Sequence, residues 1–205
     1  MCSTATRYNQ PGKKIVTCIN TDGTMPESGI FKTQLSSRSQ CSAMLALSPD
    51  GKTFYAAGVG DGYGGKKAKN AHAVHKFTWR DAKSKPFIGD PKAPGSGKTG
   101  LSWPKDVAVD KDGNLYVADN GNNRIAVFKA DGSHLADLKV DAPKCVEVNP
   151  KTGVVYVIGG PAKGAQTLTK FASMKSASAT ISTPRHTPAT RSTMTITMTM
   201  AAPFL

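Results

Sequence analysis

An internal repeat of about 40 residues constrains the fold of this chain more than any other feature of its sequence. The clearest copy begins at Pro104 and reads PKDVAVDKDGNLYVAD, followed by NGNNRIAVFKADG. A second copy begins at Pro143 and reads PKCVEVNPKTGVVYV. An earlier copy begins at Met44 with MLALSPDGKTFYAA, and VTCINTDG from Val16 matches the end of the clearest copy. Such a repeat indicates one supersecondary unit that is used several times along the chain.

Each unit divides into four short strands separated by turn residues. In the clearest copy we expect strands over about 106–110, 115–118, 124–129 and 134–140. Asp112 with Gly113, and Asp131 with Gly132, are residue pairs that favour two-residue turns with positive φ. The first three strands carry apolar side chains on both faces, which is typical of a sheet stacked between two others. The sequence therefore predicts an all-β fold built as a β-propeller of four-stranded antiparallel blades.

The clearest copy resembles the NHL-repeat family of propellers. The resemblance rests on the run from Pro104 to Asp119, then on the three residues from Asn123 to Ile125 and on Phe128. The family's histidine before the arginine is Asn123 here. The resemblance covers roughly residues 16–171. It implies a propeller, typically six-bladed, that presents an interaction surface more often than it performs catalysis.

The repeats also predict how the chain is divided. We expect an N-terminal arm over 1–14, an NHL-like partial propeller over 15–172 and a low-complexity tail over 173–205. The blades are expected at about 15–38 (incomplete), 41–90, 104–142 and 143–172 (incomplete). A closed propeller has about four to eight blades. We therefore expect a fragment, or a chain that completes its ring through another copy, with self-association through open blade edges.

The C-terminal tail differs in composition from the repeats. It is rich in Thr, Ser and Met, and the last acidic residue of the chain is Glu147. The segment TMTITMTM from Thr193 alternates as a strand does. The sequence favours an unstructured appendage, while a flexible or O-glycosylated stalk and a reading-frame shift near Met174 are the alternatives.

The chain is strongly basic, with 27 Lys and Arg against 14 Asp and Glu and a net charge of +13. Such a balance suits a polyanionic partner such as nucleic acid or acidic glycan, but it also suits a merely soluble surface. The first residues lack an apolar segment, so we expect no signal peptide in this chain, and the compartment stays open, including secretion of a longer parent. The chain contains no apolar run of about 18 residues, so we expect no membrane span.

Two loops are longer than the repeat requires, at 58–70 and 89–102. Strand alternation places both at one end of the barrel, together with the corresponding loop of the later blade. Long loops on a rigid scaffold are common binding sites. The candidate binding residues are the lysines of these loops: Lys66, Lys67, Lys69, Lys92, Lys98 and Lys163.

Several local patterns resemble known functional motifs but lack the context that those motifs require. The run GSGKTG from Gly95 lacks the first glycine and the following helix of a phosphate-binding loop. Asp110 and Asn114 look like half of a calcium loop, yet their position favours a turn in which side chains bond the backbone. His72 and His75 have a spacing that sends them to opposite faces of a strand. Cys18 and Cys145 lie in apolar runs and are expected to be buried, and the pairing of the four cysteines stays open.

The sequence therefore favours a non-catalytic binding or scaffold module with a polyanion or a protein partner on the loop face. We expect no catalytic residue, no metal site and no cofactor. Structural turn roles are expected for Asp112, Gly113, Asp119, Asn123 and Arg124. One alternative is a fragment of a metal-dependent propeller lyase or lactonase, for which the inner strands offer Asp106, Asp110, Glu147 and Asn149. A second alternative is a propeller that binds nucleic acid without sequence specificity.

Overall fold

Four antiparallel sheets follow one another along the chain. The structure is a computed structural model that describes residues 2–6, 14–18, 30–33, 44–57, 72–78, 85–161, 164–174 and 178–182. The first two sheets contain β1 (Cys2–Thr6), β2 (Lys14–Cys18) and β3 (Ile30–Thr33), then β4 (Met44–Leu47), β5 (Thr53–Ala57), β6 (Ala73–Thr78) and β7 (Lys85–Gly89). The third sheet contains β8 (Pro104–Val109), β9 (Leu115–Asp119), β10 (Arg124–Phe128) and β11 (His134–Lys139). The fourth contains β12 (Cys145–Val148), β13 (Val155–Gly159), β14 (Thr167–Phe171) and β15 (Ser178–Ser182).

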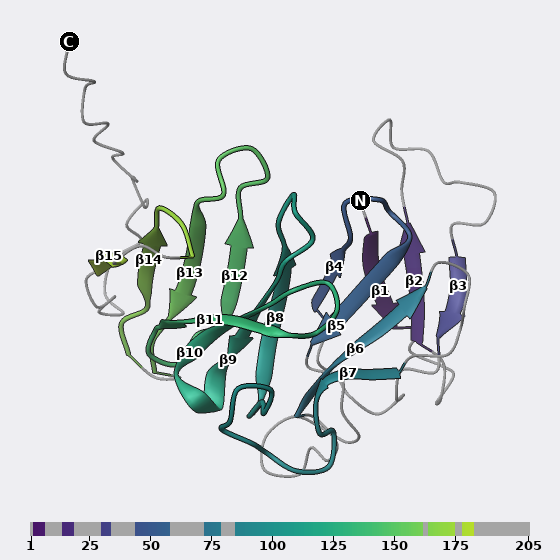
Figure 1. Ribbon diagram of the computed structural model, residues 1–205, viewed down its shortest axis with the longest axis horizontal. Coiled ribbons are helices and arrows are strands. Elements are labelled where there is room, and N and C mark those ends of the chain that lie inside the picture. The colour runs from purple at the N-terminus through teal and green to yellow at the C-terminus, as the bar shows by residue number, and fades with distance from the viewer. Residues whose placement is uncertain are drawn as a thin grey trace, which may run out of the picture.

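The sheets are arranged as consecutive blades. Within every sheet each strand pairs with the next one along the chain. The first strands of successive sheets contact one another: β1 with β4, β4 with β8, and β8 with β12. Figure 1 shows the sheets following one another from β1–β3 at the right to β12–β15 at the left. This arrangement is that of a partial β-propeller, as the repeat predicts.

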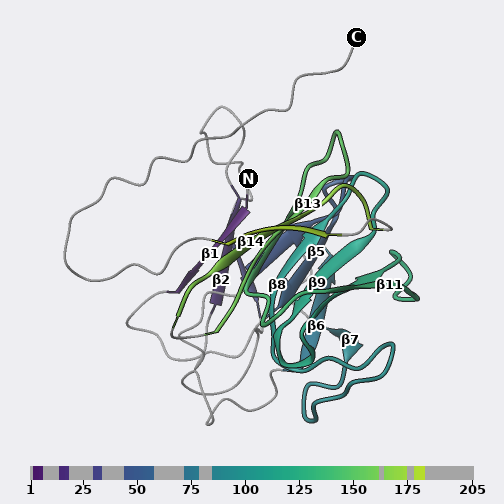
Figure 2. The ribbon, with the colours of Figure 1, turned by 90° about the vertical axis from the view of Figure 1, so that its left-hand side faces the viewer.

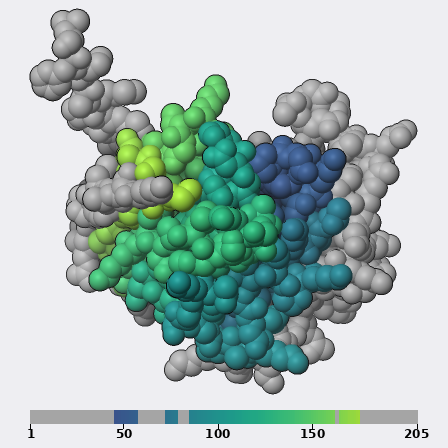
Figure 3. Space-filling view, in the orientation of Figure 1, coloured from purple at the N-terminus to yellow at the C-terminus, as the bar shows by residue number. Residues whose placement is uncertain are grey.

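Two apolar layers hold the sheets together. Between the second and third sheets, the buried residues include Tyr55, Val74, Ile88, Leu115 and Phe128. Between the third and fourth sheets, they include Tyr116, Ile125, Val127, Val146 and Val157. Burial of each such side chain stabilises the fold by about 1.5–3 kcal/mol. The fourth sheet is nearest the viewer in Figure 2, and Figure 3 shows the second and third sheets, coloured blue to green, packed without a gap.

The observed strands of the third sheet begin and end within a few residues of the predicted ones. All residues of β9 and β10 are buried, as expected for strands covered on both faces. The turns that join β8 to β9 and β10 to β11 contain Gly113 and Gly132, with φ of +81° and +89°. Among the described residues the single helical element is the three-residue turn η1 (Asn120–Asn122), and no helix is long and apolar enough to cross a membrane.

Two strands lie where the sequence predicts none. β1 falls within the range expected to be an N-terminal arm, and β15 falls within the range expected to be an unstructured tail. β1 pairs with β2, and β15 pairs with β14, each over five residue pairs. A strand at the edge of a sheet forms through backbone hydrogen bonds with its neighbouring strand, and these bonds do not require the side chains of the repeat. The missing repeat signature therefore did not prevent pairing at 178–182.

Cys145 corrects a further expectation. The sequence predicts a buried thiol, and the structure shows a free, half-buried one on β12. Burial raises the pKa of this thiol, and Asp106 raises it further. The reason for the incomplete burial is that Cys145 lies on the face of the fourth sheet that points away from the third.

Candidate functional site

The segment 89–102, which joins β7 to β8, folds back on itself. The amide of Gly95 donates to the carbonyl of Leu101 at 2.9 Å, and the amide of Gly100 donates to the carbonyl of Gly97 at 3.1 Å. A Cβ at Gly100 would lie 2.7 Å from the carbonyl carbon of Gly95. The glycines of GSGKTG therefore permit two backbone segments to cross closely, which explains this run without a bound phosphate.

Three side chains hold this loop: Asp119 at the end of β9, Asn122 in η1 and Arg124 at the start of β10. We call these three residues the clamp. Asp119, with no exposed surface, accepts a hydrogen bond from the amide of Ser102 at 2.7 Å. Its other oxygen accepts from Asn122 Nδ2 at 2.7 Å and from Arg124 Nε at 2.9 Å. The buried carboxylate thus organises both its own turn and a loop 17 residues earlier.

Arg124 and Asn122 extend the clamp to the carbonyls of the loop. One terminal nitrogen of Arg124 donates to Gly97 at 2.9 Å and to Gly100 at 2.6 Å, and the other donates to Asp137 at 3.1 Å. Asn122 Nδ2 donates to the carbonyl of Gly95 at 2.8 Å. Because charge-assisted bonds are stronger than neutral ones, these contacts fix the loop with little freedom.

The loop that follows the third sheet meets the same end of β9 and β10. Asn123 adopts φ +54°, and its side-chain oxygen accepts from the amide of Ala142 at 2.9 Å. Asn120 Nδ2 donates to the carbonyl of Pro143 at 3.0 Å. The turn at 120–123 therefore joins loop 89–102, before the third sheet, and loop 140–144, after it, into one surface. We call the surface formed by these three segments the loop end.

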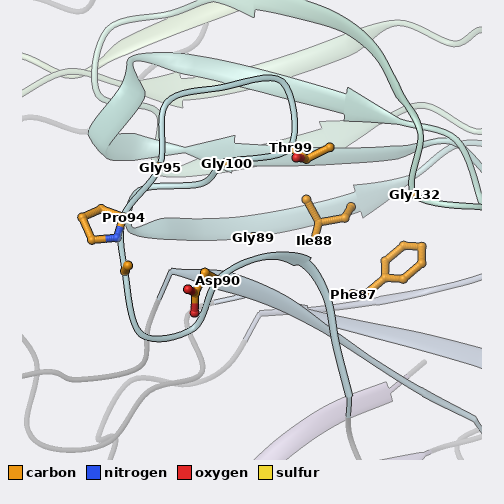
Figure 4. A pocket seen from close by; sticks show the side chains of 10 residues that line it. Phe87, Ile88, Gly89, Asp90, Pro94, Gly95, Thr99, Gly100 and Gly132 are labelled. Carbon is orange, nitrogen blue, oxygen red and sulfur yellow. The ribbon is translucent and has the colours of Figure 1, made fainter.

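A cavity of about 550 Å³ opens beside the clamped loop. Phe87 and Gly132 lie at one end of it, Pro94 and Gly95 at the other, and Ile88 and Thr99 line the space between (Figure 4). The carboxylate of Asp90 also lines it, while accepting from the amide of Lys92 at 2.9 Å. The lining thus combines a few apolar side chains with glycine backbone, one hydroxyl and one carboxylate.

The two histidines of the predicted strand region have different surroundings, and His72 precedes β6 while His75 lies within it. His72 is buried, its Nδ1 accepts from the amide of Trp103 at 3.3 Å, and its ring packs edge-on against the Trp103 ring. Burial lowers the pKa of His72, which suits a neutral imidazole acting as an acceptor. Burial also lowers the pKa of His75, whose two ring nitrogens have no hydrogen-bond partner among the described residues.

Two of the six candidate binding lysines lie in the described part of the chain. Lys92 and Lys98 are exposed on the clamped loop, which follows the last residue of β7. Lys85 is the first residue of β7 and is also exposed, so it lies at the other end of this strand. The other four lie outside the described residues: Lys66, Lys67, Lys69 and Lys163.

Asp110 and Asn149 each have hydrogen-bond partners in the turn that follows their own strand. Asp110 accepts from the amides of Asp112 and Asn114, and from the side chains of Asn114 and Tyr116. It therefore fixes the turn between β8 and β9. Burial, followed by the charge of Asp110, raises the pKa of Tyr116. Asn149 accepts from the amides of Lys151 and Thr152 in the matching turn of the fourth sheet.

Asp106 links two sheets. One oxygen accepts from the amide of Val107 at 2.8 Å, and the other accepts from the amide of Val146 on β12, also at 2.8 Å. Burial raises the pKa of Asp106 to about 6, although both amide bonds act in the opposite direction. In the described part of the chain, no three His, Cys, Asp or Glu side chains gather closely enough to hold a metal ion.

Sequence reasoning placed Asp119 and Arg124 in a turn but missed how far they reach. The contacts with Gly97, Gly100 and Ser102 cross from one blade unit to the linker before it, and no local spacing signals such a contact. The cavity and the bond from Val146 to Asp106 were missed for the same reason. The one signal in the sequence for this site was that loop 89–102 is longer than the repeat requires.

Comparison with known proteins supports the repeat assignment. Residues 101–128 match the NHL repeat family. The protein named "Probable peptidyl-alpha-hydroxyglycine alpha-amidating lyase pgal-1" of Caenorhabditis elegans is 36% identical over 69 residues, which are 33% of this chain and 20% of that protein. A streptogramin B lyase structure covers 88% of this chain at 14% identity with a TM-score of 0.54. A gluconolactonase from Xanthomonas campestris covers 77% at 18% identity with a TM-score of 0.49.

The likeness to the streptogramin B lyase shows the propeller fold alone. This chain spans 50% of that lyase structure, 44% of the gluconolactonase structure and 20% of the nematode protein. The chain thus corresponds to half or less of the length of each of these relatives.

Proposed function

We propose that this chain, a partial propeller carrying an NHL repeat, is a non-catalytic binding module whose ligand surface is the clamped loop 89–102. The observation that carries the proposal is the clamp itself. A 550 Å³ cavity beside a loop would have little value for binding if the loop were free to move. Here Asp119, Asn122 and Arg124 hold four backbone groups of the loop, so the ordering cost is met before a ligand arrives.

The ligand class that we propose is a polyanion, either nucleic acid or acidic glycan. Lys92 and Lys98 project from the clamped loop into solvent, and the chain as a whole carries a net charge of +13. Lysine side chains of this kind contact the charged groups along the backbone of a polyanion, and the resulting affinity falls steeply as the salt concentration rises. We assign Lys66, Lys67, Lys69 and Lys163 to the same surface on the basis of strand alternation.

The test is a salt titration of binding with a fluorescently labelled single-stranded oligonucleotide and with a labelled heparin fragment. Lys92→Ser combined with Lys98→Ser should weaken binding of the active probe. It should also reduce the slope of log affinity against log salt by about 1.4 for a single-stranded nucleic acid. Adding Lys66→Ser, Lys67→Ser and Lys69→Ser should abolish binding.

The matched control is Lys83→Ser combined with Lys85→Ser, which removes the same amount of charge. Lys85 begins β7, and Lys83 precedes it in the sequence and lies outside the described residues. This control should leave affinity and salt slope close to those of the unaltered protein. An equal loss in the control would mean that the charge acts diffusely and that the loop is not the binding surface. Failure of the unaltered protein to bind either probe at low salt would overturn the polyanion assignment.

A lyase activity is the second candidate, and the similarity to the nematode protein favours it. That protein is named for acting on peptidyl-α-hydroxyglycine, with an amidated peptide as the product. In this chain, backbone amides donate to Asp106, Asp110 and Asn149, so these three side chains are not freely offered, while Glu147 is exposed on β12. A direct assay of amide release from a peptidyl-α-hydroxyglycine distinguishes the two functions. Turnover that survives Lys92→Ser and Lys98→Ser would favour the lyase.

A further inference from the structure

One face of the fourth sheet points away from the rest of the described fold. Val146, Val157 and Phe171 face the third sheet and belong to the apolar layer there. Because side chains alternate along a strand, the residues between them point to the opposite side. We call this opposite side the outer face, and its residues are Cys145, Glu147, Tyr156, Ile158, Leu168 and Lys170.

The outer face is apolar at its centre but incompletely covered. Ile158 is 43% exposed, and Tyr156 and Leu168 are half-buried. By contrast, every residue of β9 and β10, which lie between two sheets, is buried. The outer face thus has the character of a blade surface that packs on another sheet, without such a sheet among the described residues. Exposed apolar surface of this kind marks an interface.

The register of the strands arranges the outer face in two rows. Cys145 pairs with Ile158, which pairs with Leu168 on the next strand. Glu147 pairs with Tyr156, which pairs with Lys170. The second row therefore places one negative and one positive side chain at equal distances on either side of a central tyrosine.

We propose that a second copy of this chain packs on the outer face around a two-fold axis that runs along β13. Such an axis exchanges the positions of β12 and β14 across the interface and keeps each row at its own level. Glu147 then lies opposite the partner's Lys170, and Lys170 opposite the partner's Glu147. Ile158 and Tyr156 lie on the axis and face the same residues of the partner.

The charges select this symmetry over the alternatives. A two-fold axis across the strands at the level of this row would place Glu147 against Glu147 and Lys170 against Lys170, and like charges in direct opposition are repelled. The axis along β13 makes both pairs attractive and joins the apolar centres, so a single patch is complementary to itself as a two-fold interface requires. The occupant that fits the outer face by its charges and its apolar centre is therefore another outer face.

Charge reversal tests this arrangement, with dimerisation measured by sedimentation equilibrium. Glu147→Lys should raise the dimer dissociation constant about tenfold, because it replaces two attractive pairs with two repulsive ones. Lys170→Glu should have the same effect. The double variant Glu147→Lys with Lys170→Glu should restore the dimer, since the pairs are exchanged rather than lost. Lys129→Glu, on the exposed turn after β10, is the control and should leave the constant unchanged.

A cysteine introduced at the proposed two-fold axis tests the interface independently of the charges. In a background with all native cysteines changed to serine, Ile158→Cys should form a disulfide-linked dimer under mild oxidation. Leu47→Cys, at a position 39% exposed on β4, should not. A monomer at all concentrations, a series of oligomers without end, or a double variant that fails to restore the dimer would each overturn the proposal. These outcomes do not involve loop 89–102, so they leave the proposed ligand surface untouched.

Discussion

At the scale of single residues, Asp119 and Arg124 show how a repeat supports a site outside itself. In the repeat, the aspartate and arginine flank a tight turn. In the structure, the same pair also binds the loop before the repeat, through the amide of Ser102 and the carbonyls of Gly97 and Gly100. The exposed fractions of the two side chains are 0% and 11%, so the buried charge of Asp119 depends on Arg124 for compensation, while Arg124 also pairs with Asp137.

Replacement of Arg124 by Ala should therefore destabilise the fold by about 3 kcal/mol or more, because it leaves a buried carboxylate without its cation. Lys111→Ala is the matched control. Lys111 also pairs with an aspartate, Asp112, but both side chains are more than half exposed, so its loss should cost less than about 1 kcal/mol. Urea unfolding of both variants measures the difference. Equal losses would show that the clamp adds nothing beyond an ordinary surface pair.

At the scale of strands and loops, the sequence predicts those elements that depend on residues next to one another in the chain. Apolar alternation and the glycine turns located β8, β9, β10 and β11, because strand and turn preferences are carried by neighbouring residues. β1 and β15 were missed because their pairing depends on partners elsewhere in the sheet. The contact between Asp106 and Val146 was missed because it joins positions 40 residues apart, one blade to the next.

Asp106 gives the contact between β8 and β12 a predictable pH dependence. Burial raises the pKa of Asp106 from 3.8 to about 6, so the folded protein holds a proton that the unfolded chain releases over that interval. This contribution to stability is fully present below pH 3.8 and is lost as pH rises through 6. Relative to Asp106→Asn, the unaltered protein should thus lose about 1–3 kcal/mol between pH 4 and 7. Urea unfolding across this range measures it, and a constant difference between the two proteins would contradict it.

At the scale of the whole molecule, stability comes from sheets stacked face to face rather than from any single sheet. The apolar layer between the second and third sheets contains Leu115, with no exposed surface, and Phe128, also fully buried. The loop end and the outer face lie on the margins of this stack. The stack can therefore keep its structure while the loops bind a ligand and the outer face meets a partner.

Leu115→Ala should destabilise the fold by about 2–5 kcal/mol, because it opens a cavity between two sheets. Leu47→Ala removes the same atoms from a side chain that is 39% exposed on β4, and should cost much less. Thermal and urea unfolding of the two variants compares a stacked position with a marginal one. Similar costs would mean that the layer between the second and third sheets is not the core of the fold.

Amide hydrogen exchange of loop 89–102 tests the central claim, that the clamp holds this loop in a binding-ready form, most directly. In the unaltered protein, the amides of Gly95, Gly100 and Ser102 should be protected, because each donates a hydrogen bond. Arg124→Lys should remove this protection and weaken polyanion binding, while the amides of β9 stay protected. Fast exchange of these three amides in the unaltered protein, or binding that persists after their protection is lost, would contradict the account.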